Sequence, residues 1–363
     1  MGKRVRWCAS ALYTAVILNL ASGCLPVDAR GTIFTPAPTE AVTPNPEEPP
    51  VQAWEGMRIP AQCVKPVPRG LAPTFVAMSP DGRWILYEQQ DHNLVHSSLY
   101  NLETGELRNA PRNWGRFDSF QWDERGRGLY ALDNPGLFDL APADRKIYWL
   151  DPEALTVQEV RDCPYCTGFD VNEKQGVLVA QRSFGQREYQ LDVVGWQEPF
   201  TNAVTVDRWR GGSYGAVILS PGAKRVGYRR GVNIKEDGVL IYALSILDLR
   251  SGVVITSLAG SSFRNIWLSD DVVLEPDLRA ARTWKRNLQT GSRTVFAEFA
   301  PEVFEDYRRT FRTFGGGEPR GIYRVMIGND GRFMLFRPRV NNSGGILHAA
   351  DLWCSRRVER ATS

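Results

Sequence analysis

The sequence predicts an all-β protein that is exported from the cytoplasm. Three features support this prediction: a basic and then apolar N-terminal stretch that ends at Cys24, a proline-rich segment behind it, and a strand–turn–strand pattern that recurs from Leu71 onward. No stretch shows a helical period longer than about three turns. With 43% hydrophobic residues, 11% aromatic residues and 33 glycines among its 363 residues, the composition is that of a folded chain rich in turns.

The first residues have the layout of a secretory signal. Lys3, Arg4 and Arg6 form a positive region, and an apolar stretch follows over residues 7–22. A helix needs about 20 apolar residues to cross a bilayer, and this stretch is shorter and interrupted by polar residues. We therefore expect residues 1–23 to be a cleaved signal peptide.

The end of this stretch, Leu20-Ala21-Ser22-Gly23-Cys24, resembles the lipobox of bacterial lipoproteins. The resemblance implies a lipid on Cys24 and a lipid-anchored protein in the periplasm or on the outer face of the cell membrane. It departs from the usual pattern at Ala21, where leucine is common. Cleavage near Gly23 without a lipid, and an uncleaved membrane anchor, are the alternatives. All three place the rest of the chain outside the cytoplasm.

Residues 24–57 are expected to form a tether. Seven prolines lie among Thr, Ala and Glu residues there, and proline favours extended polyproline-II geometry over a packed core. At about 3.1 Å per residue such a spacer reaches on the order of 100 Å. Residues 58–363 then form the folded domain.

The repeat combines a strand, a tight polar turn and a strongly apolar strand. Proline presets the first turn position, Asp or Asn caps the turn, and glycine takes the position that needs a positive φ. The apolar strand that follows is expected to be buried on both faces. The clearest copies cover 78–87, 121–130, 219–228 and 328–336, and weaker ones cover 170–179 and 266–274.

A second signature follows each apolar strand, as in Asn101-Leu102-Glu103-Thr104-Gly105 and Asp248-Leu249-Arg250-Ser251-Gly252. The two motifs together resemble the repeats of TolB-like (WD40-like) β-propellers over roughly residues 71–357. The resemblance implies a six-bladed β-propeller, or seven blades if residues 301–325 hide strands. We expect residues 301–320 to be a short helical loop instead. Propellers of this kind occur in proteins with many different functions, so the fold alone implies no function.

Four cysteines remain in the mature domain, which suits an oxidising compartment. Cys63 precedes the first blade and Cys354 is placed in the last strand, and these ends meet when a propeller closes. We therefore predict a Cys63–Cys354 disulfide. In the chain-entropy model a loop this long stabilises the fold by roughly 5 kcal/mol.

The pair Cys163 and Cys166 has the spacing of a redox motif, Cys-Pro-Tyr-Cys. Because it falls in a turn between blades two and three, without a βαβ context, we predict a local structural disulfide. A redox role or a metal site is the alternative. A metal site has little support, since His92 and His96 lie on a loop with no acidic partner at metalloprotease spacing.

The segment Gly211-Gly212-Ser213-Tyr214-Gly215 matches the nucleophile elbow of serine hydrolases and resembles that of prolyl oligopeptidases. An elbow requires a strand–turn–helix, followed in the chain by an acid and a histidine. Here an apolar strand follows, and His348 is the only downstream histidine. We predict an interblade turn and no catalytic residue.

One stretch is basic without any acidic residue. If its side chains gather on one rim they form a patch for an anionic partner, and the alternative is a solvated face neutralised by neighbouring blades. Its seven basic residues are Arg208, Arg210, Lys224, Arg225, Arg229, Arg230 and Lys235.

These features predict a protein-interaction or scaffold module that is held at the membrane and contacts protein partners of the cell envelope. We expect that it is not an enzyme and that it binds neither a cofactor nor a metal. The net charge of +3 and the lack of a phosphate-binding loop argue against nucleic acid as a partner. The alternative is binding, or hydrolysis, of a small ligand or glycan in the propeller channel. That alternative requires polar side chains to converge from several inner strands.

Overall fold

The computed structural model describes residues 54–71, 75–91, 94–133, 143–185, 188–211, 217–236, 239–258, 266–305, 319–340, 343–344 and 346–362. The predicted signal peptide, Cys24 and the tether as far as residue 53 lie outside the described residues.

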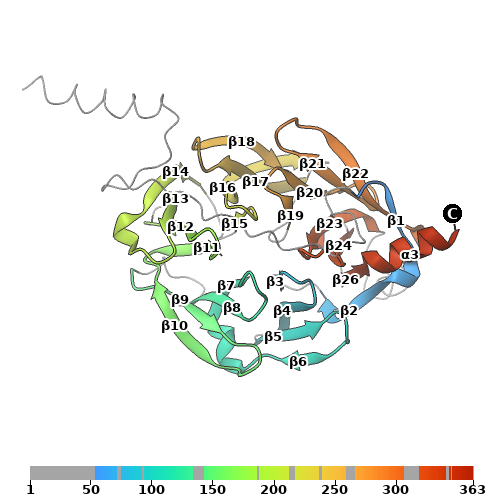
Figure 1. Ribbon diagram of the computed structural model, residues 1–363, viewed down its shortest axis with the longest axis horizontal. Coiled ribbons are helices and arrows are strands. Elements are labelled where there is room, and N and C mark those ends of the chain that lie inside the picture. The colour runs from blue at the N-terminus through green and yellow to red at the C-terminus, as the bar shows by residue number, and fades with distance from the viewer. Residues whose placement is uncertain are drawn as a thin grey trace, which may run out of the picture.

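Six sheets surround a central axis, so the six-bladed β-propeller is confirmed (Figure 1). Their strands pair antiparallel except for one added edge strand in blade 5. Blade 1 comprises β3 (Phe75–Met78), β4 (Trp84–Asp91), β5 (Leu94–Asn101) and β6 (Leu107–Asn109). Blade 2 comprises β7 (Phe117–Trp122), β8 (Leu129–Asp133), β9 (Lys146–Leu150) and β10 (Val157–Asp162). Blade 3 comprises β11 (Cys166–Asn172), β12 (Val177–Ser183), β13 (Glu188–Gly195) and β14 (Val204–Arg210).

Blade 4 has the same order, from the inner to the outer strand: β15 (Val217–Leu219), β16 (Arg225–Glu236), β17 (Val239–Asp248) and β18 (Val253–Leu258). Blade 5 contains β19 (Trp267–Ser269), β20 (Val272–Pro276), β21 (Arg282–Asn287), β22 (Arg293–Phe299) and, outside them, β1 (Met57–Ile59). Blade 6 contains β23 (Pro319–Ile327), β24 (Phe333–Val340), β26 (Ile346–Asp351) and β2 (Val64–Leu71), with the short β25 (Ser343–Gly344) beside β24. Short 3-10 helices lie between strands: η2 (Ala61–Cys63), η3 (Arg112–Arg116), η4 (Phe200–Asn202) and η5 (Pro301–Phe304).

The predicted turn connects the first and second strands of a blade. In blade 1 the Ser79 hydroxyl accepts the amide of Trp84 at 2.9 Å, and Gly82 has a φ of +67°. Gly126 and Gly331 take the same position with φ of +69°. In blade 4 the prediction was wrong in one detail, because the positive φ of 50° falls on Ala223 and not on a glycine.

Gly222, one residue earlier, is needed for a different reason. A Cβ at this position would lie 2.4 Å from an oxygen of Asp270 in blade 5. The glycine of this turn therefore permits close approach between blades, while Ala223 adopts the left-handed conformation that alanine disfavours.

The second strand of each blade is buried on both faces, which explains its continuous apolar run. Ile85, Leu86 and Tyr87 are consecutive in β4 and all fully buried. Ile85 and Tyr87 pack towards blade 6, whereas Leu86 packs towards blade 2. The core is thus a series of apolar layers between neighbouring blades rather than one central cluster.

The ring closes where the N-terminal strand β2 completes blade 6 by pairing with β26. Cys63, just before β2, is joined to Cys354 with their Cα atoms 5.6 Å apart, as predicted. Cys354 does not lie in the last strand, however. It lies in the first turn of helix α3 (Leu352–Thr362), because the Asp351 carboxylate accepts the Cys354 amide at 2.9 Å and so caps a helix there.

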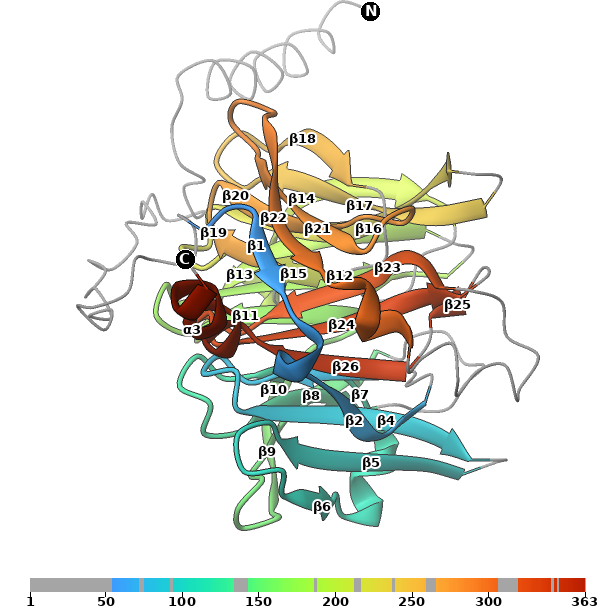
Figure 2. The same ribbon diagram turned by 90° about the vertical axis from the view of Figure 1, so that its right-hand side faces the viewer.

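Helix α3 packs beside β1 at the outer edge of blades 5 and 6 (Figures 1 and 2). Strand β1 pairs with β22 in parallel, through Met57–Ile59 opposite Ala297–Phe299. Among the described residues, no helix is both long and apolar enough to span a bilayer. The expected helical loop after blade 5 begins with η5, and its predicted end is corrected, since Pro319 and Arg320 already belong to β23.

Removing the closing disulfide should destabilise the fold far more than removing the local one. The chain-entropy model gives between roughly 5 and 6 kcal/mol for the Cys63–Cys354 loop and roughly 2 kcal/mol for the Cys163–Cys166 loop, given sequence separations of 291 and 3. We expect Cys63→Ser/Cys354→Ser to unfold at much lower urea concentration than Cys163→Ser/Cys166→Ser. Equal midpoints for the two double variants would contradict the proposed role of β2 in closure.

Candidate interaction surface

One face of the ring is held together by bonds between the strand 1–2 turns of successive blades. The Asn329 amide donates to the carbonyl of Pro80 at 2.7 Å, linking blade 6 to blade 1. The Asn172 side chain donates to the carbonyl of Pro221 at 2.9 Å, linking blade 3 to blade 4. The Gly222 amide donates to Asp270 at 2.7 Å, linking blade 4 to blade 5. These hydrogen bonds hold the face rigid, and they occupy polar groups of the turns that would otherwise face solvent.

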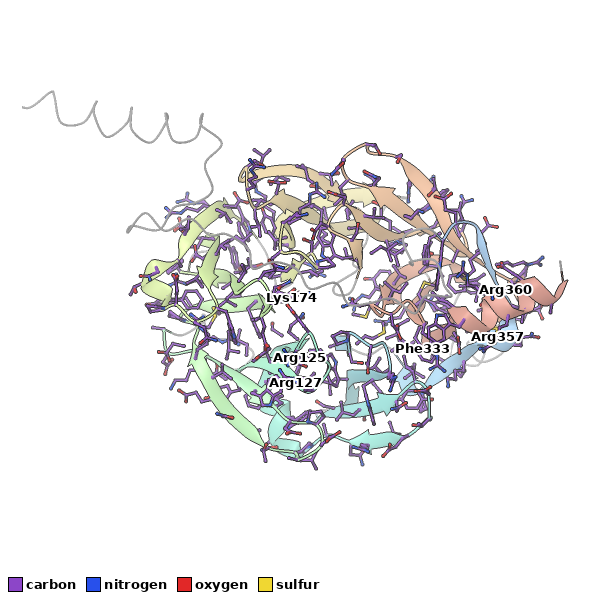
Figure 3. All side chains as sticks on the ribbon, viewed as in Figure 1. Arg125, Arg127, Lys174, Phe333, Arg357 and Arg360 are labelled. Atoms are coloured by element: carbon purple, nitrogen blue, oxygen red, sulfur yellow. A yellow bond between two sulfur atoms is a disulfide. The ribbon has the colours of Figure 1, made fainter. Side chains whose placement is uncertain are left out.

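Charges on this face are mixed in sign. Figure 3 labels Arg125, Arg127 and Lys174 near the axis of the ring. Arg127 pairs with the buried Asp123 at 2.8 Å and lies 3.7 Å from Glu173 of blade 3. Such pairing neutralises the charge of Arg127 on this face.

The inner strands offer few polar groups to a ligand in the channel. Asp170 of β11 is buried, and its carboxylate accepts the Leu219 amide of blade 4 at 2.6 Å. Within the described part of the chain, no three His, Cys, Asp or Glu side chains are grouped so that they could hold a metal ion. A cavity of about 200 Å³ lies between blades 1 and 2, beside the end of the inner strand β7. It is lined by Trp84, Leu99, Arg108, Trp122, Gly126, Arg127, Pro152 and Glu153.

Cys163 and Cys166 form a disulfide in the connection between blades 2 and 3. Both residues are fully buried. The guanidinium of Arg145, also buried, donates to the carbonyl oxygens of Asp133 and Cys166 and so fixes this loop to blade 2. Thiol–disulfide exchange requires access to a sulfur atom, so the burial favours a structural role over a redox role.

An aromatic cluster lies beside this loop. The rings of Tyr165 and Phe184 lie 5.0 Å apart, and the guanidinium of Arg182 stands 4.9 Å from the Phe184 ring. Phe184 is 47% exposed although it is large and apolar. Aromatic and arginine side chains of this kind are enriched at the centres of protein interfaces.

The predicted basic rim is distributed over two blades. Arg208 and Arg210 lie on the outer strand β14, whereas Lys224 and Arg225 lie at the turn between β15 and β16. Arg229 and Arg230 lie further along β16, and the side chain of Lys235 is outside the described residues.

Carboxylates neutralise four members of this set. The pairs are Arg210 with Glu188, Lys224 with Asp270, Arg225 with Asp271, and Arg230 with Asp207. Two of these acids, Asp270 and Asp271, lie in the next blade and more than 40 positions along the chain, and the sequence pattern could not reveal them. These basic residues therefore form separate ion pairs rather than one continuous basic patch.

The structure describes only part of the serine motif and of the histidines. Residues 212–216, with Ser213, lie outside the described residues between β14 and β15, and so does His92. His96 is in β5, but its side chain is not described. His348 is buried and stacks on Phe336, with a ring nitrogen 3.0 Å from the carbonyl of Ile346. Burial lowers the pKa of His348.

The feature that sequence reasoning missed is the apolar exposure of three outer strands. Val160 of β10, Val204 of β14, and Val253 and Ile255 of β18 are between 39% and 56% exposed. They belong to the consecutive blades 2, 3 and 4, and we call them the outer wall. The run Val253-Val254-Ile255, directly after a hairpin turn, is the sequence signal that could have indicated it. Blade 5 differs, because β1 pairs with β22 and covers its outer edge.

No protein-family model and no curated protein matches this chain. Among solved structures, it is similar to TolB from Acinetobacter baumannii, with a TM-score of 0.43 and 13% identity over 76% of this chain and 56% of that chain. It is also similar to a chain of the nidogen/laminin complex, with a TM-score of 0.42 and 11% identity over 63% of this chain and 85% of that chain. A prolyl endopeptidase is similar with a TM-score of 0.38 and 12% identity over 62% of this chain and 42% of that chain. The chain thus spans little more than half the length of TolB. Similarities this low concern the fold alone.

Blades 6 and 1 meet at a pair of carboxylates. Asp330 lies against Gly82, and its carboxylate accepts the amide of Arg332 at 3.0 Å. Burial in this junction, followed by the charge of Asp81, raises the pKa of Asp330 to about 6, although Arg332 and Arg83 act in the opposite direction. The residue as a whole is nevertheless exposed, so solvent screens the effect on stability strongly.

Because the folded-state pKa of Asp330 is above its ordinary value, the folded protein binds the extra proton and loses stability as pH rises from about 4 through 6. We expect Asp330→Asn, which keeps an acceptor for the Arg332 amide, to gain about 1 kcal/mol over the native chain between about pH 4 and pH 7.5. Urea unfolding at both pH values measures the gain. A difference between the two chains that does not change with pH would refute it.

Proposed function

We propose that this chain is a lipoprotein tethered outside the cytoplasm through Cys24, and that its propeller is a protein-interaction module within an envelope assembly. The signal-like N-terminus, the lipobox and two disulfides support the compartment. The outer wall supports the interaction. Its partner is a protein that contacts blades 2–4 from the side of the ring.

The outer wall supports this function because exposed edge strands are normally protected. Proteins blunt such edges with charges, prolines or covering segments. Strand β18 has the sequence Val-Val-Ile-Thr-Ser-Leu, with neither charge nor proline, and Val253 is 56% exposed. Large exposed apolar side chains on three successive outer strands are typical of a surface that another protein covers.

The propeller itself shows how such an edge is covered. Strand β1 adds to the outer edge of blade 5 and buries Met57 and Ile59 while Arg58 stays exposed. An extended segment of a partner can pair with β18 in the same way, by main-chain hydrogen bonds and alternating side chains.

The alternative function, a small ligand or glycan in the channel, has less support. The polar groups of the inner strands and their turns bond from blade to blade, as Asp170 and Asn172 do. We also propose that the chain is not an enzyme, because a nucleophile elbow requires a helix behind the serine and β15 begins at Val217 instead.

Purification of the tagged protein from gently solubilised membranes tests the interaction. We expect a stoichiometric set of companion proteins, and we expect Val253→Lys/Ile255→Lys to lose them, because two charges are then placed in an apolar contact. The matched control is Gln289→Lys/Glu302→Gln, which adds the same charge at exposed sites of blade 5. A protein that is recovered alone, or equal loss in both variants, would refute the role of the outer wall.

Replacement of Cys24 tests the anchor. We expect Cys24→Ser to abolish incorporation of labelled palmitate and to move the protein from the membrane to the soluble fraction, since one serine cannot take the thioether-linked lipid. Labelling that persists, or a membrane fraction that is unchanged, would contradict the anchor. The Cys63→Ser/Cys354→Ser variant is a control for loss of folding without loss of the lipid.

A further inference from the structure

The turns between the third and fourth strands of blades 1, 2, 4 and 5 are built alike. The first residue is Asn or Asp, and its side chain accepts two amides further along the turn, as Asp151 accepts those of Glu153 and Ala154 at 2.8 Å. Three of these turns place glycine at the fifth position, with φ between +68° and +76°: Gly105, Gly252 and Gly291. In blade 2 that position holds Leu155, with a φ of +57°.

Leu155 is therefore an exception among otherwise equivalent turns. The left-handed conformation brings the Cβ atom of an L-residue too close to the backbone, so leucine costs free energy that glycine avoids. The Leu155 side chain is also 46% exposed, so burial within the fold offsets little of this cost. Strained residues that the fold does not require are typical of functional sites, where a partner supplies the missing contacts.

The same turn forms one wall of the cavity between blades 1 and 2. Pro152 and Glu153 line the cavity from blade 2, whereas Trp84 and Leu99 line it from blade 1. Its volume is about 200 Å³, and an apolar cavity of roughly 150 Å³ is large enough to bind benzene. One aromatic side chain therefore fits between the two blades.

The charges at the cavity favour a neutral ligand. Arg108 donates to Glu106 at 2.6 Å, and Arg127 pairs with Asp123 at 2.8 Å. The carboxylate of Glu106, and after it that of Glu153, raises the pKa of Arg108. An ionised ligand group would have to compete with these pairs, whereas an uncharged ring can lie against the guanidinium groups without breaking them.

We propose that the cavity and Leu155 form a docking site, in which a partner protein covers Leu155 and inserts one aromatic side chain into the cavity. The guanidinium of Arg108 lies over the Trp84 ring at 5.1 Å. Trp122 is buried, and its indole nitrogen donates to the carbonyl of Ala77 at 3.3 Å. Neither ring offers an open face on which a sugar could stack, and the aliphatic Leu155 offers a glycan no hydrogen bond, so a protein is favoured.

The docking site is continuous with the outer wall. Leu155 lies in the turn of the β9–β10 hairpin, and the outer-wall residue Val160, 39% exposed, lies in the second strand of that hairpin. One partner can therefore contact both from the edge of blade 2. Aromatic side chains that fill pockets carry much of the binding energy of protein interfaces. The inference thus deepens the proposed function and rests on it for the existence of the partner.

A small aromatic probe tests the cavity without any partner protein. We expect N-acetyl-tyrosinamide to bind the exported full chain with Cys24→Ser weakly and saturably in saturation-transfer NMR, and N-acetyl-alaninamide not to bind. Glu153→Trp should lose this binding, because its ring competes for the cavity. The matched control is Gln289→Trp, at the equivalent exposed position of the blade 5 turn, which should bind as the parent does. No binding of the probe, or equal binding by the two variants, would overturn the proposal.

Substitution of Leu155 separates backbone strain from binding. We expect Leu155→Gly to unfold at higher urea concentration than the native chain, since glycine relieves the left-handed conformation, and yet to lose the companion proteins. Leu155→Met, which keeps an apolar side chain, should retain them. The matched control is Gly291→Leu, where an added Cβ has room. It should unfold at lower urea concentration and retain the companions.

The two proposals fail in different ways. If Leu155→Gly retains companions that Val253→Lys/Ile255→Lys loses, the docking site is refuted while the outer wall stands. If the native chain has no companions, the proposed function is refuted, and with it the partner at Leu155. Loss of the companions in Leu155→Gly together with saturable binding of the probe supports the docking site.

Discussion

The pairing of β2 with β26 is the constraint on which the rest of the structure depends. A ring of blades has no fixed diameter until its first and last blades are joined, and here a strand from the start of the chain completes the sheet built by its end. The Cys63–Cys354 disulfide secures the same junction. Because closure brings blade 6 against blade 1, it also creates the contact between Asn329 and Pro80 and the close approach of Asp330 to Gly82.

Closure also decides where the chain leaves the fold. Strand β1 precedes β2 and must lie on the neighbouring blade 5, and α3 follows β26 directly, so both meet at one outer edge of the ring. Trp54, the first described residue, and α3 are therefore neighbours as a consequence of closure. The same arrangement leaves the outer edges of blades 2, 3 and 4 without a covering strand, and these edges form the outer wall.

The turn motif was predictable because its physics is local. A capping carboxylate and a glycine with positive φ act within four residues, so the copies in blades 1, 2 and 6 occur as expected, with a proline in blade 1 only. The exception in blade 4 has a tertiary reason, because the close approach of Asp270 requires Gly222 at the third position and leaves Ala223 at the strained one. Helix α3 was not predicted, because Asp351 directly continues an apolar strand. Its role as a helix cap follows only from its hydrogen bond with the Cys354 amide in the structure.

The sequence by itself determined the repeat and the pairing of the cysteines, and it favoured six blades over seven. Turn chemistry and hydrophobic alternation are local, and the meeting of the chain ends follows once a closed ring is assumed. Only the tertiary structure decided which charges are neutralised and which apolar strands are left uncovered. Arg225 and Asp271, or Lys224 and Asp270, meet across a blade boundary although more than 40 positions separate them. Side-chain pairing of this kind depends on the distance between blades, which no local pattern specifies.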